Sequence, residues 1–86
     1  MTFEVKLSKR AHRELLSLDL VTKSRIVQRL EELQGDPFPS GVVKLQGRKD
    51  TYRTRVGDYR ILYEVRSEEG LVLVEKIDHR SGVYGP

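Results

Sequence analysis

The chain has 86 residues, a formal net charge of +3 at neutral pH and no cysteine. A length of this order predicts one domain, residues 1–86, with one small core, and the missing thiols exclude disulfides, thiolate nucleophiles and thiolate metal sites. Because the sequence has neither a signal-peptide h-region at its start nor an apolar run that could span a bilayer, we expect a soluble cytoplasmic protein without a membrane partner.

The first half of the chain passes from a strand pattern to a helical pattern. "FEVKL", residues 3–7, alternates apolar and charged side chains, as a half-buried strand does. Ser8 stands at an N-cap position before apolar residues at helical spacing, which predicts a helix over residues 9–18. Asp19 takes the same position before a second helix over residues 20–35, whose last residue is a glycine suited to end it.

The second half is rich in strand-forming residues. A connector dense in Gly and Pro, "GDPFPSG", precedes three segments rich in Tyr, Val, Ile and Leu, at residues 52–56, 59–66 and 71–78. Short polar turns separate these segments, which predicts an antiparallel meander. The predicted fold is therefore α+β with the order βααβββ: an antiparallel sheet with the helical hairpin packed on one face.

The first two meander strands are joined by the dipeptide "GD", in which Gly57 can adopt the positive φ of a tight hairpin turn. The resulting register sets Arg55 opposite Arg60 and places Arg53, Arg55 and Arg60, here called the arginine face, on the side away from the helices. Like charges directly opposite each other destabilise a sheet by some tenths of a kcal/mol, roughly, so folding alone does not call for this arrangement. Residues 44–60 carry six Lys/Arg against two Asp/Glu, a concentration typical of proteins that bind a polyanion.

Two interpretations of the arginine face remain open at this point. The guanidinium groups either point into water, where salt screens their repulsion, or are neutralised by Glu64 and Asp58. Alternatively, planar guanidinium forks held on a rigid sheet bind phosphate oxygens in bidentate fashion, and a bound anion turns the repulsion into attraction.

The position of His79 depends on the register of the last strand. If residues 67–70 form the loop, Arg60 pairs with Ile77, and the alternation of side chains puts His79 on the arginine face. A slip of one residue would reverse this placement, and an ordinary surface histidine is the alternative interpretation.

Three pieces of the sequence carry a family resemblance: "KLQG" at 44–47, "YRTRVGDYRILYEV" at 52–65 and "HRSGVY" at 79–84. In their order and spacing behind the βαα opening, they resemble the RelE/ParE superfamily of toxins from bacterial and archaeal toxin–antitoxin systems, most of all its archaeal RelE-type members. The resemblance covers almost the whole chain. It implies an mRNA interferase, which enters the A site of a 70S-type ribosome, cuts the mRNA there and is held inactive by a RelB-like antitoxin. The carboxylates are scattered and lack the clustered spacing of a two-metal site, so we expect no metal and no cofactor.

The resemblance also assigns roles to residues. We expect a catalytic set of Arg53, Arg55, Arg60, His79, Arg80 and Tyr84, and further contacts with RNA or the ribosome from Lys44, Arg48 and Lys49. The chain departs from members of the family that carry lysines on the first hairpin strand, because it has arginine at both positions. His79 matches only the branches that keep a histidine near the C-terminus.

RNA cleavage suits these residues because it needs no nucleophile from the protein. The 2′-hydroxyl beside the scissile phosphate can attack in line and leave a 2′,3′-cyclic phosphate, while arginines stabilise the developing charge. Arginine stays protonated at any ordinary pH, which leaves His79 and Tyr84 as candidates for proton transfer. Tyr84 is alternatively suited to stack on an unpaired base, or to pack on the core as a terminal residue.

Two other functions fit the same sequence. A ParE-type toxin has the same fold and antitoxin but poisons a topoisomerase, gyrase, and cleaves no RNA. A catalytically inactive RelE homologue would bind RNA through the basic face without cutting it.

Overall fold

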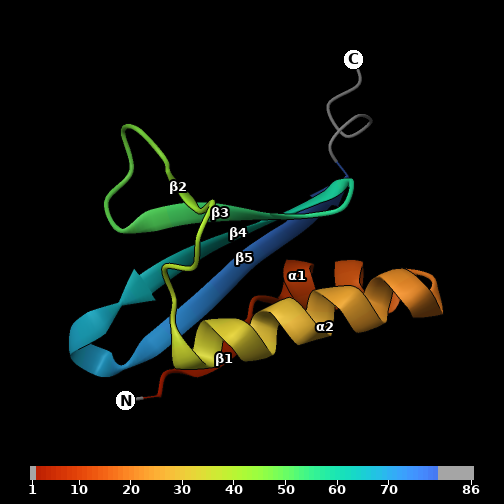
Figure 1. Ribbon diagram of the computed structural model, residues 1–86, viewed down its shortest axis with the longest axis horizontal. Coiled ribbons are helices and arrows are strands. Elements are labelled where there is room, and N and C mark those ends of the chain that lie inside the picture. The colour runs from red at the N-terminus through yellow and green to blue at the C-terminus, as the bar shows by residue number, and fades with distance from the viewer. Residues whose placement is uncertain (1, 80–86) are drawn as a thin grey trace.

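The structure, a computed structural model that describes residues 2–79, contains five strands, two α-helices and one short 3-10 helix within that range (Figure 1). In chain order these are β1 (Glu4–Leu7), α1 (Lys9–Leu16), α2 (Leu20–Gly35), β2 (Val43–Lys44), β3 (Thr51–Val56), β4 (Tyr59–Arg66), η1 (Ser67–Glu69) and β5 (Leu71–His79). Both helices lie on one side of the sheet, and the segment around β2 rises on the other side (Figure 1). The predicted α+β class, with a helical hairpin on one face, is confirmed.

The strands lie side by side in the order β1-β5-β4-β3-β2. The pairs β2–β3, β3–β4 and β4–β5 are antiparallel, as the predicted meander requires. The strand β1, however, pairs with β5 in parallel, so the sheet is mixed. The helical hairpin is the crossover that a parallel pair needs. The strand β2 was not predicted, because two exposed residues are too few to show a periodic pattern.

Both helices begin at the predicted caps. Ser8 Oγ accepts a hydrogen bond from the Ala11 N–H at 3.0 Å, and the Asp19 carboxylate accepts one from the Thr22 N–H at 3.1 Å. The hydrogen bonds from Thr22 also lower the pKa of the Asp19 carboxyl below its ordinary value. The first helix ends at Leu16, earlier than the predicted residue 18. Within residues 2–79, neither helix combines the length and apolar character needed to cross a bilayer.

The core lies between the helices and the face of the sheet that they cover. Its buried apolar residues are Ala11, Leu15, Ile26, Leu30, Leu33, Ile61, Tyr63, Val65, Val72, Val74 and Ile77. The Tyr63 hydroxyl donates a hydrogen bond to the Pro37 carbonyl at 2.7 Å, and burial raises the pKa of that hydroxyl. This contact ties the connector after α2 to the middle of the sheet. The core therefore supports the strands from one side only and leaves the other side open for function.

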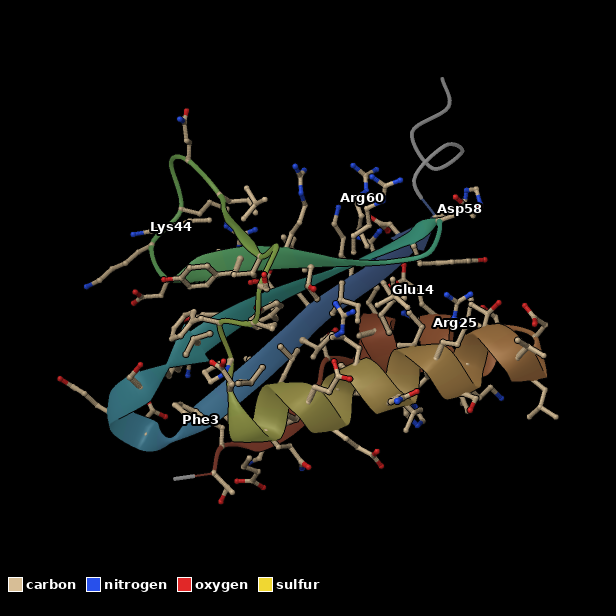
Figure 2. All side chains as sticks on the ribbon, viewed as in Figure 1. Phe3, Glu14, Arg25, Lys44, Asp58 and Arg60 are labelled. Atoms are coloured by element: carbon tan, nitrogen blue, oxygen red, sulfur yellow. The ribbon has the colours of Figure 1, made fainter. Side chains whose placement is uncertain are left out.

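Beyond the end of the short strand β1, the helix α1 and its N-cap Ser8 form hydrogen bonds with the edge of β5. The Ser8 N–H donates to the Val74 carbonyl at 2.9 Å, and Ser8 Oγ donates to the Glu75 carbonyl at 2.8 Å. A carboxylate oxygen of Glu14, which Figure 2 shows between α1 and the sheet, accepts the Ile77 N–H at 2.7 Å. These bonds continue the hydrogen bonding along this edge of β5 past the end of β1. They hold in place the part of β5 that carries its irregularity.

Candidate nucleic-acid interface

The β3–β4 hairpin has the predicted register. Its paired residues are Val56–Tyr59, Arg55–Arg60, Thr54–Ile61, Arg53–Leu62 and Tyr52–Tyr63. Gly57 adopts a φ of 59° in the two-residue turn, as the tight connection requires. Thr54 is buried at 2% exposure towards the helices, so its neighbours Arg53 and Arg55 project from the opposite face.

The arginine face forms one cleft. Arg53, Arg55 and Arg60 line a cavity of about 460 Å³ together with Gly41 and Val43 from the segment around β2. Figure 2 shows Arg60 projecting from the side of the sheet that faces away from α2. The three guanidinium groups thus come from two adjacent strands and converge on one space, which confirms their predicted placement on one face.

The carboxylate of Glu64 is engaged elsewhere. It accepts a hydrogen bond from Arg66 Nε at 3.1 Å, and this bond raises the pKa of Arg66. Glu64 is therefore not the counter-charge of Arg53 that one interpretation of the sequence assigned to it. Arg53 and Arg55 are both exposed, and Arg55 Nε lies 3.3 Å from the Gly57 carbonyl. The face keeps a concentration of positive charge that can meet an anion.

A fourth arginine, Arg29 of α2, anchors β3 from the helix side. Its Nη1 donates to Thr54 Oγ1 at 2.6 Å and to the Arg55 carbonyl at 3.1 Å, while its Nε pairs with Glu32 at 2.9 Å. Hydrogen bonds from a charged group are stronger than neutral ones. Arg29 thereby holds the backbone of the residues that carry the arginine face.

A second, smaller cavity of about 120 Å³ adjoins the first and shares Arg53 and Arg60 with it. Leu45, Leu62, Lys76 and Asp78 complete its lining. The Lys76 ammonium lies 3.2 Å from one carboxylate oxygen of Asp78, and Arg10 lies 3.7 Å from the other. Asp78 is only 5% exposed. An ion pair between a part-exposed lysine and a buried aspartate therefore lies at the edge of the arginine face.

The predicted position of His79 is wrong. As expected, Arg66 pairs with Leu71 across the loop and Tyr63 pairs with Val74, but the register then shifts between Leu62 and Tyr63. Such a bulge inserts one extra residue, and every side chain beyond it moves to the other face. Arg60 consequently pairs with Asp78, where the sequence predicted Ile77.

His79 pairs instead with Tyr59 on the side of the sheet that the helices cover. The two rings meet edge to face with their centroids 5.0 Å apart. His79 also lines a cavity with Asp19 and Arg25, the first an N-cap and the second a residue of α2. It is therefore separated from the arginine face by the thickness of the sheet.

The other predicted RNA contacts lie around β2 and the following loop. Lys44 is exposed and pairs with Tyr52 along the edge of the sheet, and Figure 2 shows its side chain there. Arg48 forms an ion pair with Glu75, in which its Nη2 donates to both carboxylate oxygens at 3.0 and 2.8 Å. Lys49 is exposed as well but lines neither cavity of the arginine face. The structure thus separates these three cations from the cleft.

The positions of Lys76 and Asp78 and the anchoring role of Arg29 were not predicted from the sequence. Without the bulge, the alternation of side chains along β5 would place both Lys76 and Asp78 on the side of the helices, so the sequence pattern did not assign them to the arginine face. No signal in the sequence identifies Arg29 among the other charged residues of α2. Arg80 and Tyr84, predicted as catalytic, lie outside the described residues.

Comparison with known proteins gives consistent matches over most of the chain. The sequence model of a family described as "ParE toxin of type II toxin-antitoxin system, parDE" matches residues 5–84. The chain is 29% identical over 87 residues to the candidate toxin RelE1 of Methanocaldococcus jannaschii, covering 98% of this chain and 97% of that protein. It is 27% identical over 85 residues to toxin RelG of Mycobacterium tuberculosis, with 98% of each covered.

Solved structures agree with these matches. In the archaeal RelE–RelB complex of Pyrococcus horikoshii, one chain superposes with a TM-score of 0.84 at 32% identity, over 96% of this chain and 100% of that one. A chain of the toxin–antitoxin complex RelBE2 of M. tuberculosis superposes with a TM-score of 0.81 at 26% identity, over 93% and 100%. The chain described here therefore belongs to the ParE/RelE family of toxins of type II toxin–antitoxin systems.

Proposed function

We propose that this toxin is an endoribonuclease that cleaves mRNA on the ribosome and so inhibits translation. The observation that carries the proposal is the convergence of Arg53, Arg55 and Arg60 on one cleft of about 460 Å³. The names of its relatives, RelE and RelG toxins, support the same conclusion. A phosphate in the cleft would relieve the repulsion between the guanidinium groups, which gives the cleft an affinity for an RNA backbone.

In the proposed reaction, the 2′-oxygen attacks the adjacent phosphorus while the bond from phosphorus to the 5′-oxygen breaks. The products are a 2′,3′-cyclic phosphate and a 5′-hydroxyl, and no residue of the protein is covalently modified. Guanidinium donors aimed at the phosphorane stabilise the charge that develops on its oxygens. Each such donor contributes about 3 kcal/mol, or roughly a factor of 10² to 10³ in rate.

The fold supplies the rigidity that this stabilisation requires. The arginines stand on paired strands, and Arg29 holds the backbone at Thr54 and Arg55 from the helix side. Donors that are already in position need no reorganisation when the charge develops. A cluster of arginines on a mobile loop would lose much of this advantage.

Proton transfer must come from other groups, because arginine stays protonated at ordinary pH. His79 is not proposed for this task, since the sheet separates it from the arginine face. Tyr84 and Arg80 remain proposed contributors from the C-terminal segment: Tyr84 by proton transfer or by stacking on a base, and Arg80 by charge stabilisation. Lys44, Arg48 and Lys49 are proposed to contact RNA or the ribosome outside the cleft.

An antitoxin is proposed as the second partner. The superposed chain from P. horikoshii comes from a RelE–RelB complex. The superposed chain from M. tuberculosis comes from the toxin–antitoxin complex RelBE2. A RelB-like partner would silence this toxin by covering the arginine face. Addition of the cognate antitoxin at a stoichiometric ratio should then block cleavage and also protect Arg53 and Arg55 from arginine-modifying reagents.

The test of the proposal is cleavage of a defined mRNA by the purified toxin, with and without 70S ribosomes. Cuts should be found only in ribosome-bound message, at the A site, and the 5′ fragment should end in a 2′,3′-cyclic phosphate. Arg60→Ala should remove them. An intact message with wild-type toxin at stoichiometric concentration rejects the endoribonuclease.

A ParE-type function is the second candidate, because the matched family is described by the name ParE. In that case the target is a topoisomerase, and the toxin inhibits DNA supercoiling by gyrase while leaving mRNA intact. Parallel assays on ribosomes and on gyrase separate the two functions. An inactive RNA-binding homologue would be negative in both assays and still bind RNA.

A further inference from the structure

Lys76 and Asp78 form an ion pair on the face of the sheet that carries the arginines. The Lys76 Nζ lies 3.2 Å from Asp78 Oδ2, and the two side chains are 29% and 5% exposed. Burial of the Asp78 carboxylate costs desolvation energy, and packing alone is served as well by an apolar side chain. Stability alone therefore does not explain why an ion pair occupies this place in the sheet.

The bulge in β5 is what brings this pair to the arginine face. It sets Lys76 opposite Leu62 and Asp78 opposite Arg60, where an unbroken ladder would have turned both towards the helices. Both side chains line the cavity that shares Arg53 and Arg60 with the main cleft. An RNA phosphate held by those two arginines would lie next to the Lys76 ammonium.

The chemistry of the lining singles out Lys76. Among the described residues that line the two cavities, Lys76 and Asp78 are the titratable side chains other than arginine. Asp78 is almost fully buried between Lys76 and Arg10, which leaves its carboxylate facing cations and away from a substrate. Lys76 lines the cavity, is part-exposed, and carries an ammonium group that can release a proton to an alkoxide.

We propose that Lys76 is a further catalytic residue, which donates a proton to the 5′-oxygen as the strand breaks, and that Asp78 is a positioning residue that holds the ammonium in place. The inference rests on the proposed endoribonuclease. The 2′-oxygen forms its bond to phosphorus and loses its proton to solvent water. The electron pair of the breaking bond goes to the 5′-oxygen, which takes a proton from Lys76 Nζ, and water then reprotonates the lysine.

Two substitutions at Lys76 separate proton donation from charge and from structure. Lys76→Met removes the ammonium, while Lys76→Arg keeps the charge and the contact with Asp78 but cannot release a proton. Both variants should lower the single-turnover rate on ribosome-bound mRNA by about 10²-fold or more, the size usual for a proton donor. Lys6→Met, at an exposed position of β1, is the matched control and should leave the rate unchanged.

The decisive comparison uses an mRNA with sulfur in place of the bridging 5′-oxygen at the cut site. A thiolate departs without a proton, so this substrate should restore both Lys76 variants to within about tenfold of wild type. Asp78→Asn should show a smaller defect that the sulfur substrate also restores. Arg55→Ala should stay slow on both substrates, because its donor acts on the phosphorane oxygens.

The outcomes distinguish the inference from the proposed function. If wild-type toxin cuts the message and Lys76→Met and Lys76→Arg cut it equally fast, the inference is wrong and the endoribonuclease stands. Equal defects on the oxygen and sulfur substrates also overturn it, since the ammonium would then act by charge alone. If wild-type toxin cuts neither substrate, the proposed function itself fails. Circular dichroism and urea unfolding of each variant exclude a folding defect as the cause.

Discussion

Arg55 lies directly opposite Arg60 in the β3–β4 ladder, on the face of the sheet that the helices leave open. Two like charges at such a pair oppose folding slightly. Arg53 joins them in one cleft, and Glu64, the counter-charge that one interpretation of the sequence proposed, is engaged with Arg66. A bound anion would turn the repulsion between Arg55 and Arg60 into a shared attraction, which is the physical basis of the proposed RNA site.

Replacement of Arg55 should separate stability from activity. Arg55→Ala removes the cross-strand repulsion, so the free energy of unfolding should stay the same or rise by a few tenths of a kcal/mol, roughly. Cleavage and growth arrest should fall, with a loss of about 10² to 10³ in rate. Urea unfolding and mapped cleavage measure the two effects. Arg66→Ala, at the end of the neighbouring strand β4 and away from the cleft, is the control. An equal loss of cleavage there would contradict a specific role for Arg55.

Phosphate binding should be visible without catalysis. A 2′-deoxy oligonucleotide cannot react, yet it should bind the arginine face with an affinity that falls as salt rises. For a single strand, loss of one phosphate contact in Arg55→Ala should reduce the slope of log affinity against log salt by about 0.7. Fluorescence anisotropy over a range of salt concentrations measures this slope. An unchanged slope would mean that Arg55 contacts no phosphate.

The anchor Arg29 should matter more for stability than its partner Glu32. Arg29→Met breaks the hydrogen bonds to Thr54 and to the Arg55 carbonyl, and the loss should be about 1.5–3 kcal/mol, the range for bonds to a charged group. Glu32→Gln breaks only an exposed ion pair and should cost less than about 1 kcal/mol. Urea denaturation of both variants tests the difference. Equal losses would show that the surface ion pair, and not the anchor of β3, stabilises this contact.

Asp19 makes the stability of the protein sensitive to acid. Its folded-state pKa is lowered by hydrogen bonds from Thr22, so its contribution is present above the pKa of the unfolded chain and is lost as the pH falls through the folded pKa. Asp19→Asn keeps a side chain that caps the helix but does not titrate. The variant should match wild type at pH 7 and lose less stability between pH 5 and pH 2. If both proteins lose the same free energy of unfolding as the pH falls, Asp19 does not have this role.

The parts of the site that could be predicted are those governed by local rules. The two-residue turn at Gly57 sets the hairpin register, and the register places Arg53, Arg55 and Arg60 on one face. Ser8 marks the start of its helix for the same reason, because a cap depends on its immediate neighbours. These features follow from residues a few positions apart.

What could not be predicted depends on contacts between distant segments. The bulge in β5 occurs where α1 takes over the strand edge from β1, with Glu14 accepting the Ile77 N–H across 63 positions of sequence. That one shift removes His79 from the arginine face and brings Lys76 and Asp78 to it. The parallel pairing of β1 with β5 is equally invisible in the alternating pattern of residues 3–7, which reads the same in either direction.

The central claim is that the arginine face holds the RNA backbone during cleavage, and one assay tests it most directly. Wild-type toxin and the double variant Arg53→Ala, Arg55→Ala are incubated with translating 70S ribosomes, and the 3′ ends of the message are mapped and analysed chemically. We expect A-site cuts that end in 2′,3′-cyclic phosphate for wild type, and an intact message for the folded double variant. Identical cuts by both proteins would contradict the account.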